Sequence, residues 1–198
     1  AFNFPCAVSG WNTAIGLMCG NTMIWKGHEE SSLVSVAVSR IVSDVLKTHG
    51  FESVFTLCQG TGAEVGERFL QDKRIGLVSF TGSTKTGRHA ASTVAGRFGK
   101  TILELGGNNA AVIMEDADLD MALVGSVFGA AGTCGQRCTS LRRMLVQDSI
   151  FDEMAAKMAK AYSTIKIGDP LDPNSLVGPL KTKTQIETFK NGVAEAQR

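Results

Sequence analysis

Apolar and polar positions along the first half of the chain predict strands that alternate with helices. Short apolar runs are typical of buried strands, and the stretches between them carry apolar residues at the helical period. We expect strands near residues 22–25, 53–57, 75–80 and 101–105, and helices near 31–49, 63–71 and 84–95. This alternation is typical of a doubly wound parallel sheet, so the sequence predicts an α/β fold.

The same alternation restarts after Gly106 and Gly107. It predicts a strand at 110–114, a helix capped by Asp116 or Asp118, a strand at 144–146, and helices at 149–165 and from about 182. We therefore expect a domain boundary after residue 106, with a second α/β domain beginning at residue 107.

Composition excludes several classes of protein. The 20 Lys and Arg residues nearly balance the 19 Asp and Glu residues, which leaves a net charge of +1 and no electrostatic basis for nucleic-acid binding. No apolar run approaches the roughly 18 residues that a membrane-spanning helix requires. The amino terminus lacks the pattern of a signal peptide, and the absence of a leading Met is typical of an excerpt from a longer protein.

One cysteine, Cys138, stands where chemistry is expected. It follows a glycine-rich run and comes directly after Arg137. A thiolate is a strong nucleophile, and nearby cations or backbone N–H groups stabilise it. Upstream, Glu104 ends an apolar run and is followed by Leu105 and two glycines. A nucleophilic cysteine and a carboxylate base are the minimum set for forming and hydrolysing a thioester.

The other cysteines limit what Cys138 could do. The chain has five, Cys6, Cys19, Cys58, Cys134 and Cys138, and no two are in a C-x-x-C pair. An odd count without such pairs favours free thiols in a reducing compartment over a disulfide framework. None of the three His residues is near Cys134 or Cys138 in sequence, so we expect no metal site. A buried, unreactive thiol remains the alternative interpretation for Cys138 alone.

Two glycine-rich turns, 60–66 and 80–87, join predicted strands to predicted helices. Each would place backbone N–H groups and a helix N-terminus at the carboxyl edge of a parallel strand, where anions bind. Ordinary turn chemistry explains either turn alone, but two in one sheet favour a nucleotide. Lys26 and Glu29 follow the first strand and could meet ribose hydroxyls or a phosphate, or could form a solvated surface pair.

In order along the chain, five segments resemble motifs of the aldehyde dehydrogenase superfamily. They are Phe2-Asn3-Phe4-Pro5, Trp25-Lys26 with Glu29, Phe80-Thr81-Gly82-Ser83-Thr84, Glu104-Leu105-Gly106-Gly107 and Gly135-Gln136-Arg137-Cys138. Finer features, such as Gly106-Gly107-Asn108-Asn109, resemble the antiquitin, or α-aminoadipic semialdehyde dehydrogenase, branch. The resemblance covers essentially the whole chain. One departure is Lys26-Gly27, where many relatives carry Lys-Pro.

The resemblance implies NAD-dependent oxidation of an aldehyde to a carboxylic acid through a thiohemiacetal and a thioester. Cys138 would be the nucleophile, Glu104 the base that activates water, and Asn3 a donor to the oxyanion. The branch implies α-aminoadipic semialdehyde of lysine catabolism, or a related semialdehyde, as substrate. Arg137 would clamp a remote carboxylate and Thr139 would contact the substrate. A surface or subunit-contact role for Arg137 stays open.

NAD is the implied cofactor. Glu29 favours NAD over NADP because a carboxylate repels a 2′-phosphate. Residues 1–106 would be part of a Rossmann-like NAD-binding domain, and residues 107–198 part of the catalytic domain. The implied cofactor-binding residues are Phe2, Lys26, Glu29, Gly62, Gly66, Gly82, Ser83 and Leu105.

The resemblance further implies a longer, soluble enzyme that forms a homotetramer in the cytoplasm or the mitochondrial matrix. Two other functions stay open. The chain could be an inactive NAD-binding fragment of such an enzyme. It could also be a cysteine acyltransferase or hydrolase, but that chemistry needs a His base near Cys138. The nearest one in sequence, His89, falls in the cofactor half.

Overall fold

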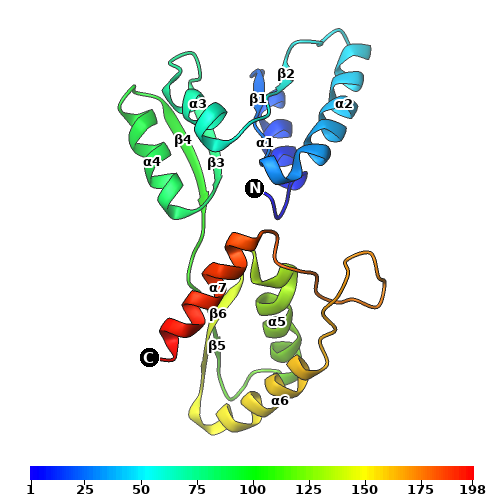
Figure 1. Cartoon of the computed structure of the whole chain (residues 1–198), viewed down its shortest axis with the longest axis vertical. Helices are drawn as coiled ribbons and strands as arrows, with labels where there is room; N and C mark the ends of the chain where they lie inside the picture. Colours follow the sequence, from blue (N-terminus) through cyan, green and yellow to red (C-terminus); the bar gives the residue numbers. More distant parts are fainter. The chain divides into compact units, whose positions relative to one another are not determined.

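The structure, a computed structural model, describes all 198 residues. The chain divides into two compact units, residues 1–106 and 107–198 (Figure 1). The first unit combines two parallel strand pairs with helices and the second unit combines one pair with helices, which confirms the predicted α/β class. No helix is long and apolar enough to cross a membrane.

The first unit contains four helices and four strands, most of them within a few residues of the predicted positions. They are α1 (Ala7–Met18), β1 (Met23–Trp25), α2 (Ser32–Thr48), β2 (Phe55–Leu57), α3 (Glu67–Gln71), β3 (Leu77–Gly82), α4 (Thr84–Ala95) and β4 (Lys100–Leu105). The predicted helix at 63–71 is split, because a π-helical turn, Gly62–Gly66, precedes α3. Helix α1 was not predicted.

Hydrogen bonds join the strands of the first unit as parallel pairs. Met23 of β1 lies opposite Phe55 of β2, and Leu77 of β3 lies opposite Lys100 of β4. The predicted parallel pairing is therefore confirmed, although the ladders β1–β2 and β3–β4 are separate pairs. Within each pair the carboxyl ends of the strands lie at the same edge. Most of the predicted cofactor residues come in the segments that follow these ends.

Local chemistry explains how α2 ends. Gly50 has a φ of 78°, the N–H of Phe51 donates to the carbonyl of Leu46, and the N–H of Gly50 donates to the carbonyl of Lys47. This is a Schellman motif, and it ends α2 at Thr48, within one residue of the predicted end at 49. Ser31 does precede the helix, but its hydroxyl donates to the carbonyl of His28 and does not cap α2.

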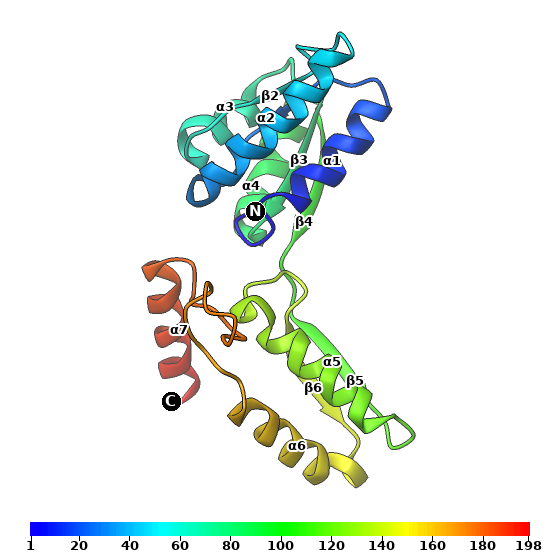
Figure 2. The same ribbon diagram turned by 90° about the vertical axis from the view of Figure 1, so that its right-hand side faces the viewer.

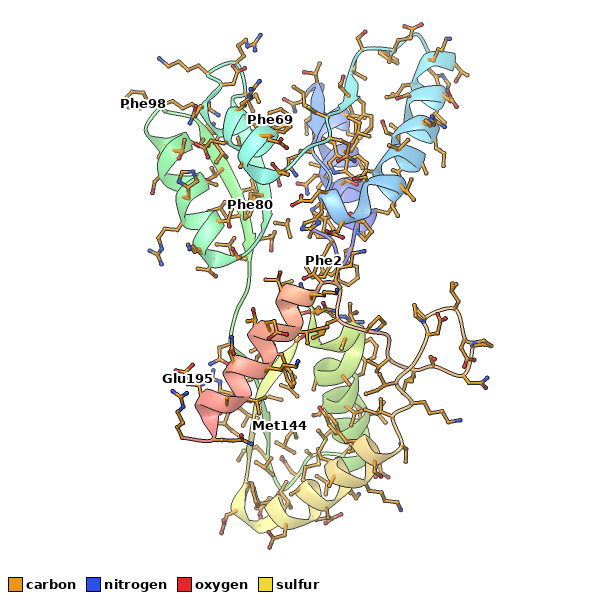
Figure 3. All side chains as sticks on the ribbon, viewed as in Figure 1. Phe2, Phe69, Phe80, Phe98, Met144 and Glu195 are labelled. Atoms are coloured by element: carbon orange, nitrogen blue, oxygen red, sulfur yellow. The ribbon has the colours of Figure 1, made fainter.

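The core of the first unit lies between helices α3 and α4 and strand β3. Leu70, Ala90 and Val94 are buried together, and Val78 packs against them. The turn after helix α4 is strained, because Phe98 has a φ of 61°. The side chain of Phe98 is fully exposed. Figure 3 shows Phe98 in the loop that leads from α4 into β4. This loop is at the amino end of β4, away from the edge that carries Glu104.

The second unit contains β5 (Asn109–Ile113), α5 (Leu119–Ala131), β6 (Leu141–Val146), α6 (Phe151–Ser163) and α7 (Lys183–Ala196). Asp118 caps α5 by accepting hydrogen bonds from the backbone N–H groups of Asp120 and Met121, as predicted. Strands β5 and β6 are parallel, and α5 connects them (Figure 2). The turn between α5 and β6 carries Cys138.

Candidate active site

The turn that carries the candidate nucleophile has an unusual backbone. Thr133 and Cys134 both have a φ of 55°, and Gly135 follows with a φ of 69°. Left-handed backbone at two consecutive residues other than glycine is strained and persists only where the surroundings enforce it. The strained segment reverses the chain after α5 and leaves Cys138 exposed and Cys134 half-buried.

Asn109, at the start of β5, ties this turn to the sheet. Its Nδ2 donates to the carbonyl oxygens of Cys138, at 2.7 Å, and Ser140, at 3.0 Å. Ser140 is almost fully buried, and its hydroxyl accepts a hydrogen bond from the backbone N–H of Arg137 at 3.1 Å. The backbone on both sides of the thiol is therefore fixed from β5. Sequence reasoning missed Asn109, whose only signal was its place in the Gly-Gly-Asn-Asn segment.

The Arg137 side chain folds back over its own turn. Its Nε donates to the hydroxyl of Thr133 at 2.8 Å, and its guanidinium lies 4.6 Å from the ring centroid of Phe128. A Cβ at Gly132 would lie 3.1 Å from the guanidinium, so the glycine makes room for it. These contacts hold a positive charge beside Cys138. Thr139, the other predicted substrate residue, is exposed.

Glu104 and Asn3 lie in the first unit, whereas Cys138 lies in the second. Glu104 is exposed near the end of β4, opposite Thr81 of β3. The side chain of its neighbour Leu105 packs on Gly87 of α4, where a Cβ would overlap it. Because successive side chains of a strand alternate, Glu104 points to the opposite face of β4 from α4.

Several predicted cofactor residues gather beyond the end of β1. Lys26 Nζ lies 3.6 Å from a carboxylate oxygen of Glu29 and donates to the carbonyl of Gly27 at 2.9 Å. A Cβ at Gly66 would lie 3.9 Å from Lys26 Cδ, and the ring of Phe2 meets that of His28 edge-on at 5.6 Å. The structure thus brings Phe2, Lys26, Glu29 and Gly66 into one neighbourhood.

The electrostatics of this neighbourhood favour an ionised carboxylate. A hydrogen bond from its own backbone is the largest cause that lowers the pKa of Glu29, and His28 and Lys26 contribute further. Burial lowers the pKa of His28, which keeps the imidazole neutral. His28 Nδ1 accepts from the backbone N–H of Glu30 at 3.2 Å. Glu29 therefore presents a negative charge to any group bound here.

In each of the two glycine-rich turns, 60–66 and 80–87, a side chain caps the start of the helical segment. Thr61 and Glu64 form a capping box around the π-helical turn, and a Cβ at Gly62 would meet no atom within 4 Å. Ser83 caps α4, because its hydroxyl accepts from the backbone N–H of Thr86 at 3.2 Å. Gly82 ends β3 directly before this cap.

Two buried polar side chains near the carboxyl ends of strands β2 and β3 have no hydrogen-bond partner. They are the amide of Gln59, in which both Nε2 and Oε1 are buried, and the hydroxyl of Thr81. Gln59 lies just past the end of β2, and Thr81 precedes Gly82 in β3. Buried polar groups normally have partners, so both fit a site that receives a polar ligand. Sequence reasoning missed them because burial is set by tertiary packing. No group of three or more His, Cys, Asp or Glu residues is placed to hold a metal ion.

Comparison with known proteins identifies the family. A comparison with protein-family models matches residues 1–198 to the aldehyde dehydrogenase family. This chain belongs to the aldehyde dehydrogenase family. It is 51% identical over 199 residues to a Dictyostelium discoideum homolog of aldehyde dehydrogenase family 7 member A1, covering 100% of this chain and 39% of that protein. It is 48% identical to the rat α-aminoadipic semialdehyde dehydrogenase, covering 100% of this chain and 37% of that protein. The predicted resemblance to the antiquitin branch is confirmed.

Solved structures of aldehyde dehydrogenases share the fold. The glyceraldehyde-3-phosphate dehydrogenase GapN from Methanocaldococcus jannaschii, complexed with NADP, has a TM-score of 0.94 and 30% identity over 98% of this chain and 42% of its own. Betaine aldehyde dehydrogenase from Staphylococcus aureus, in complex with NAD+, has a TM-score of 0.90 and 32% identity over 98% of this chain and 38% of its own. The chain spans about two fifths of the length of the curated relatives it matches, such as the 39% of the Dictyostelium protein.

Proposed function

We propose that the protein to which this aldehyde dehydrogenase chain belongs oxidises α-aminoadipic semialdehyde, or a related semialdehyde, with NAD. The single observation that carries the proposal is the exposed Cys138 on a strained turn that Asn109 fixes to β5. The 48% identity to the rat α-aminoadipic semialdehyde dehydrogenase supports the choice of substrate. The activity is proposed for the whole protein, since this chain covers 37% of that relative.

Cys138 would act as a thiolate and attack the carbonyl carbon of the aldehyde, which forms a thiohemiacetal. The Cys138 backbone N–H and the Asn3 amide would donate to the oxyanion, and one such donor typically lowers the barrier by about 3–4 kcal/mol. The bound nicotinamide ring would supply the hydride acceptor that turns the thiohemiacetal into a thioester. Glu104 would then take a proton from a water that attacks the thioester, releasing the acid and restoring the thiolate.

NAD would be held mainly by the first unit. Lys26 and Glu29 would bind the adenosine ribose, and the ionised Glu29 would repel the 2′-phosphate of NADP. The buried amide of Gln59 and hydroxyl of Thr81, both without partners, fit a polar cofactor at this edge. The remaining residues proposed to contact NAD are Phe2, Gly62, Gly66, Gly82, Ser83 and the backbone of Leu105.

Arg137 and Thr139 would bind the substrate beside the thiol. The contacts of Arg137 with Thr133 and Phe128 hold its guanidinium in the turn between α5 and β6, called here the cysteine turn. There the guanidinium would bind the carboxylate at the far end of the substrate. Residues 1–106 would then be part of the NAD-binding domain and residues 107–198 part of the catalytic domain. We also propose the homotetramer that the family resemblance implies.

The proposal is tested by incubating the protein with NAD and α-aminoadipic semialdehyde and following NADH and acid formation. We expect one NADH for each acid, and loss of both in Cys138→Ser. NAD binding without NADH formation would support the alternative of an inactive NAD-binding fragment. Acid or acyl transfer without NADH would support a cysteine hydrolase or acyltransferase.

A further inference from the structure

Gln136, two residues before Cys138, fastens the cysteine turn through both ends of its side-chain amide. Its Nε2 donates to the carbonyl of Thr133 at 3.1 Å, and its own backbone N–H donates to the same carbonyl at 3.0 Å. Its Oε1 accepts from the backbone N–H of Lys181 at 3.0 Å. A carbonyl needs a donor and an N–H needs an acceptor, so the amide fits between Thr133 and Lys181 in one orientation only.

The carbonyl that Gln136 holds belongs to the strained part of the turn. Thr133 and Cys134 both have a φ of 55°, and backbone of this kind persists only where surrounding groups enforce it. Two donors on the Thr133 carbonyl help to enforce it. Lys181 directly precedes Thr182, the cap residue of α7, so the same amide also links the turn to the segment that leads into α7.

The hydrogen bonds of the turn leave the backbone N–H of Cys138 itself unused. The N–H of Arg137 donates to the hydroxyl of Ser140, and the N–H of Ser140 donates to the carbonyl of Arg137. The N–H of Cys138 donates to no group of the second unit. An N–H beside a nucleophile stabilises an oxyanion only if it already points to the place where the negative charge develops. The turn must therefore hold this N–H in a fixed direction.

We propose that Gln136 is a positioning residue for Cys138: its amide holds the turn so that the Cys138 N–H points at the oxyanion of the thiohemiacetal. This role rests on the proposed function, because it requires aldehyde oxidation at Cys138. Gln136 acts through the backbone of the turn and not by contact with the aldehyde. Loss of the amide therefore slows attack on a carbonyl, but it does not slow a reaction of the same thiol that forms no oxyanion.

The experiment compares Gln136→Met with the unmodified protein in two reactions of Cys138. Methionine has a similar length but no amide, so both side-chain hydrogen bonds are lost. The first reaction is a single turnover of α-aminoadipic semialdehyde with saturating NAD and excess protein, in which the rate of NADH formation does not depend on thioester hydrolysis. Removal of one oxyanion donor costs about 100- to 1,000-fold in rate, so a misdirected donor should slow this turnover about 10-fold or more.

The second reaction is alkylation of the thiolate by iodoacetamide, in which a sulfur–carbon bond forms and iodide leaves. Its rate is measured from the mass of the tryptic peptide 138–142. No oxyanion forms, so the rate in Gln136→Met should stay within about 2-fold of that in the unmodified protein. Cys138 is already exposed, so a looser turn gives the reagent no new access. A role confined to folding would change both reactions together.

Two further variants complete the comparison. Gln136→Glu keeps an acceptor for the N–H of Lys181 but places a carboxylate oxygen against the carbonyl of Thr133, so it should also slow the single turnover. Gln197→Met makes the same change as Gln136→Met at the exposed end of α7 and should leave both rates unchanged. Thermal unfolding of each variant identifies any that fails to fold, and if Gln136→Met does so, Gln136→Glu carries the test.

The outcomes separate this role from the proposed function. A slower single turnover in Gln136→Met, with alkylation unchanged, supports the positioning role. An unchanged single turnover, or equal slowing of oxidation and alkylation, would overturn the role of Gln136 and leave the proposed function standing. Absence of NADH formation in the unmodified protein, whose Cys138 is still alkylated, would overturn the proposed function itself.

Discussion

Asn109 is predicted to control the order of the cysteine turn, and Asn109→Ala removes both of its side-chain hydrogen bonds. One goes to the carbonyl of Cys138 at 2.7 Å and the other to that of Ser140 at 3.0 Å. Each is worth about 0.5–1.5 kcal/mol, so the pair contributes about 1–3 kcal/mol. These hydrogen bonds exist only in the closed turn, so Asn109→Ala destabilises the closed turn relative to the open one. The population of the open turn should therefore rise about 5- to 150-fold.

Amide hydrogen exchange followed by mass spectrometry measures that population. The backbone N–H groups of Arg137 and Ser140 are both bonded within the turn and should exchange faster in Asn109→Ala by the factor given above. The matched control is Asn108→Ala, since Asn108 is engaged through its backbone carbonyl, which accepts from Arg143 at 2.8 Å. Unchanged exchange at residues 137–140 in Asn109→Ala would refute the view that Asn109 fixes the turn that carries Cys138.

Three further predictions concern chemistry and cofactor choice. Glu104→Gln should show a burst of NADH followed by a slow steady state in stopped-flow traces, because thioester hydrolysis lacks its base; a trace with no burst would place Glu104 earlier. Arg137→Ala should lower kcat/KM for α-aminoadipic semialdehyde about 10- to 150-fold, as expected for a charged hydrogen bond, and for hexanal only a few fold. Equal losses would assign Arg137 to holding its turn. Glu29→Gln should improve NADP binding relative to NAD by about 5-fold or more, since it removes roughly 1 kcal/mol or more of charge repulsion; an unchanged ratio would remove Glu29 from the ribose site.

The pH dependence of cofactor choice follows from Glu29. Its lowered pKa means that the carboxylate stays ionised below the usual range of a Glu side chain. Because a phosphate monoester takes up its second proton near pH 6, the ratio of the NADP and NAD dissociation constants is compared with that of Glu29→Gln at each pH. The extra discrimination of the unmodified protein should persist through the usual range of a Glu side chain and decline only when pH falls to the lowered pKa. In Glu29→Gln the ratio should lose this acid-dependent change.

Elements with strong local signals were predicted closely from the sequence. Helix α4 spans the predicted residues 84–95, because Ser83 supplies a cap and the following turn leaves the helix. Helix α1 was missed although Val8, Trp11 and Ile15 recur at helical spacing. Its cap position is Cys6, which makes no side-chain cap, and two glycines interrupt its sequence. Without a start signal and with weak helix formers inside, periodicity alone did not identify it.

The candidate site also contains some residues that the sequence could predict and others that it could not. The sequence predicts roles for Cys138, Glu104 and Lys26 because they stand in segments that resemble motifs of the family. Asn109 and Gln59 could not, because their importance comes from contacts across long sequence separations and from burial. The conformation of Thr133 and Cys134 was equally hidden, since neither residue type favours a left-handed backbone.

The most direct test of Cys138 as the nucleophile is to trap the thioester and locate it. Glu104→Gln is incubated with NAD and α-aminoadipic semialdehyde, quenched in acid and digested with trypsin. Cleavage after Arg137 and Arg142 places Cys138 on the peptide 138–142, whereas Cys134 stays on the peptide 101–137. We expect the mass of the acyl group on peptide 138–142, in an amount equal to the NADH burst. The acyl group on peptide 101–137, or an NADH burst with no acyl peptide, would contradict the account.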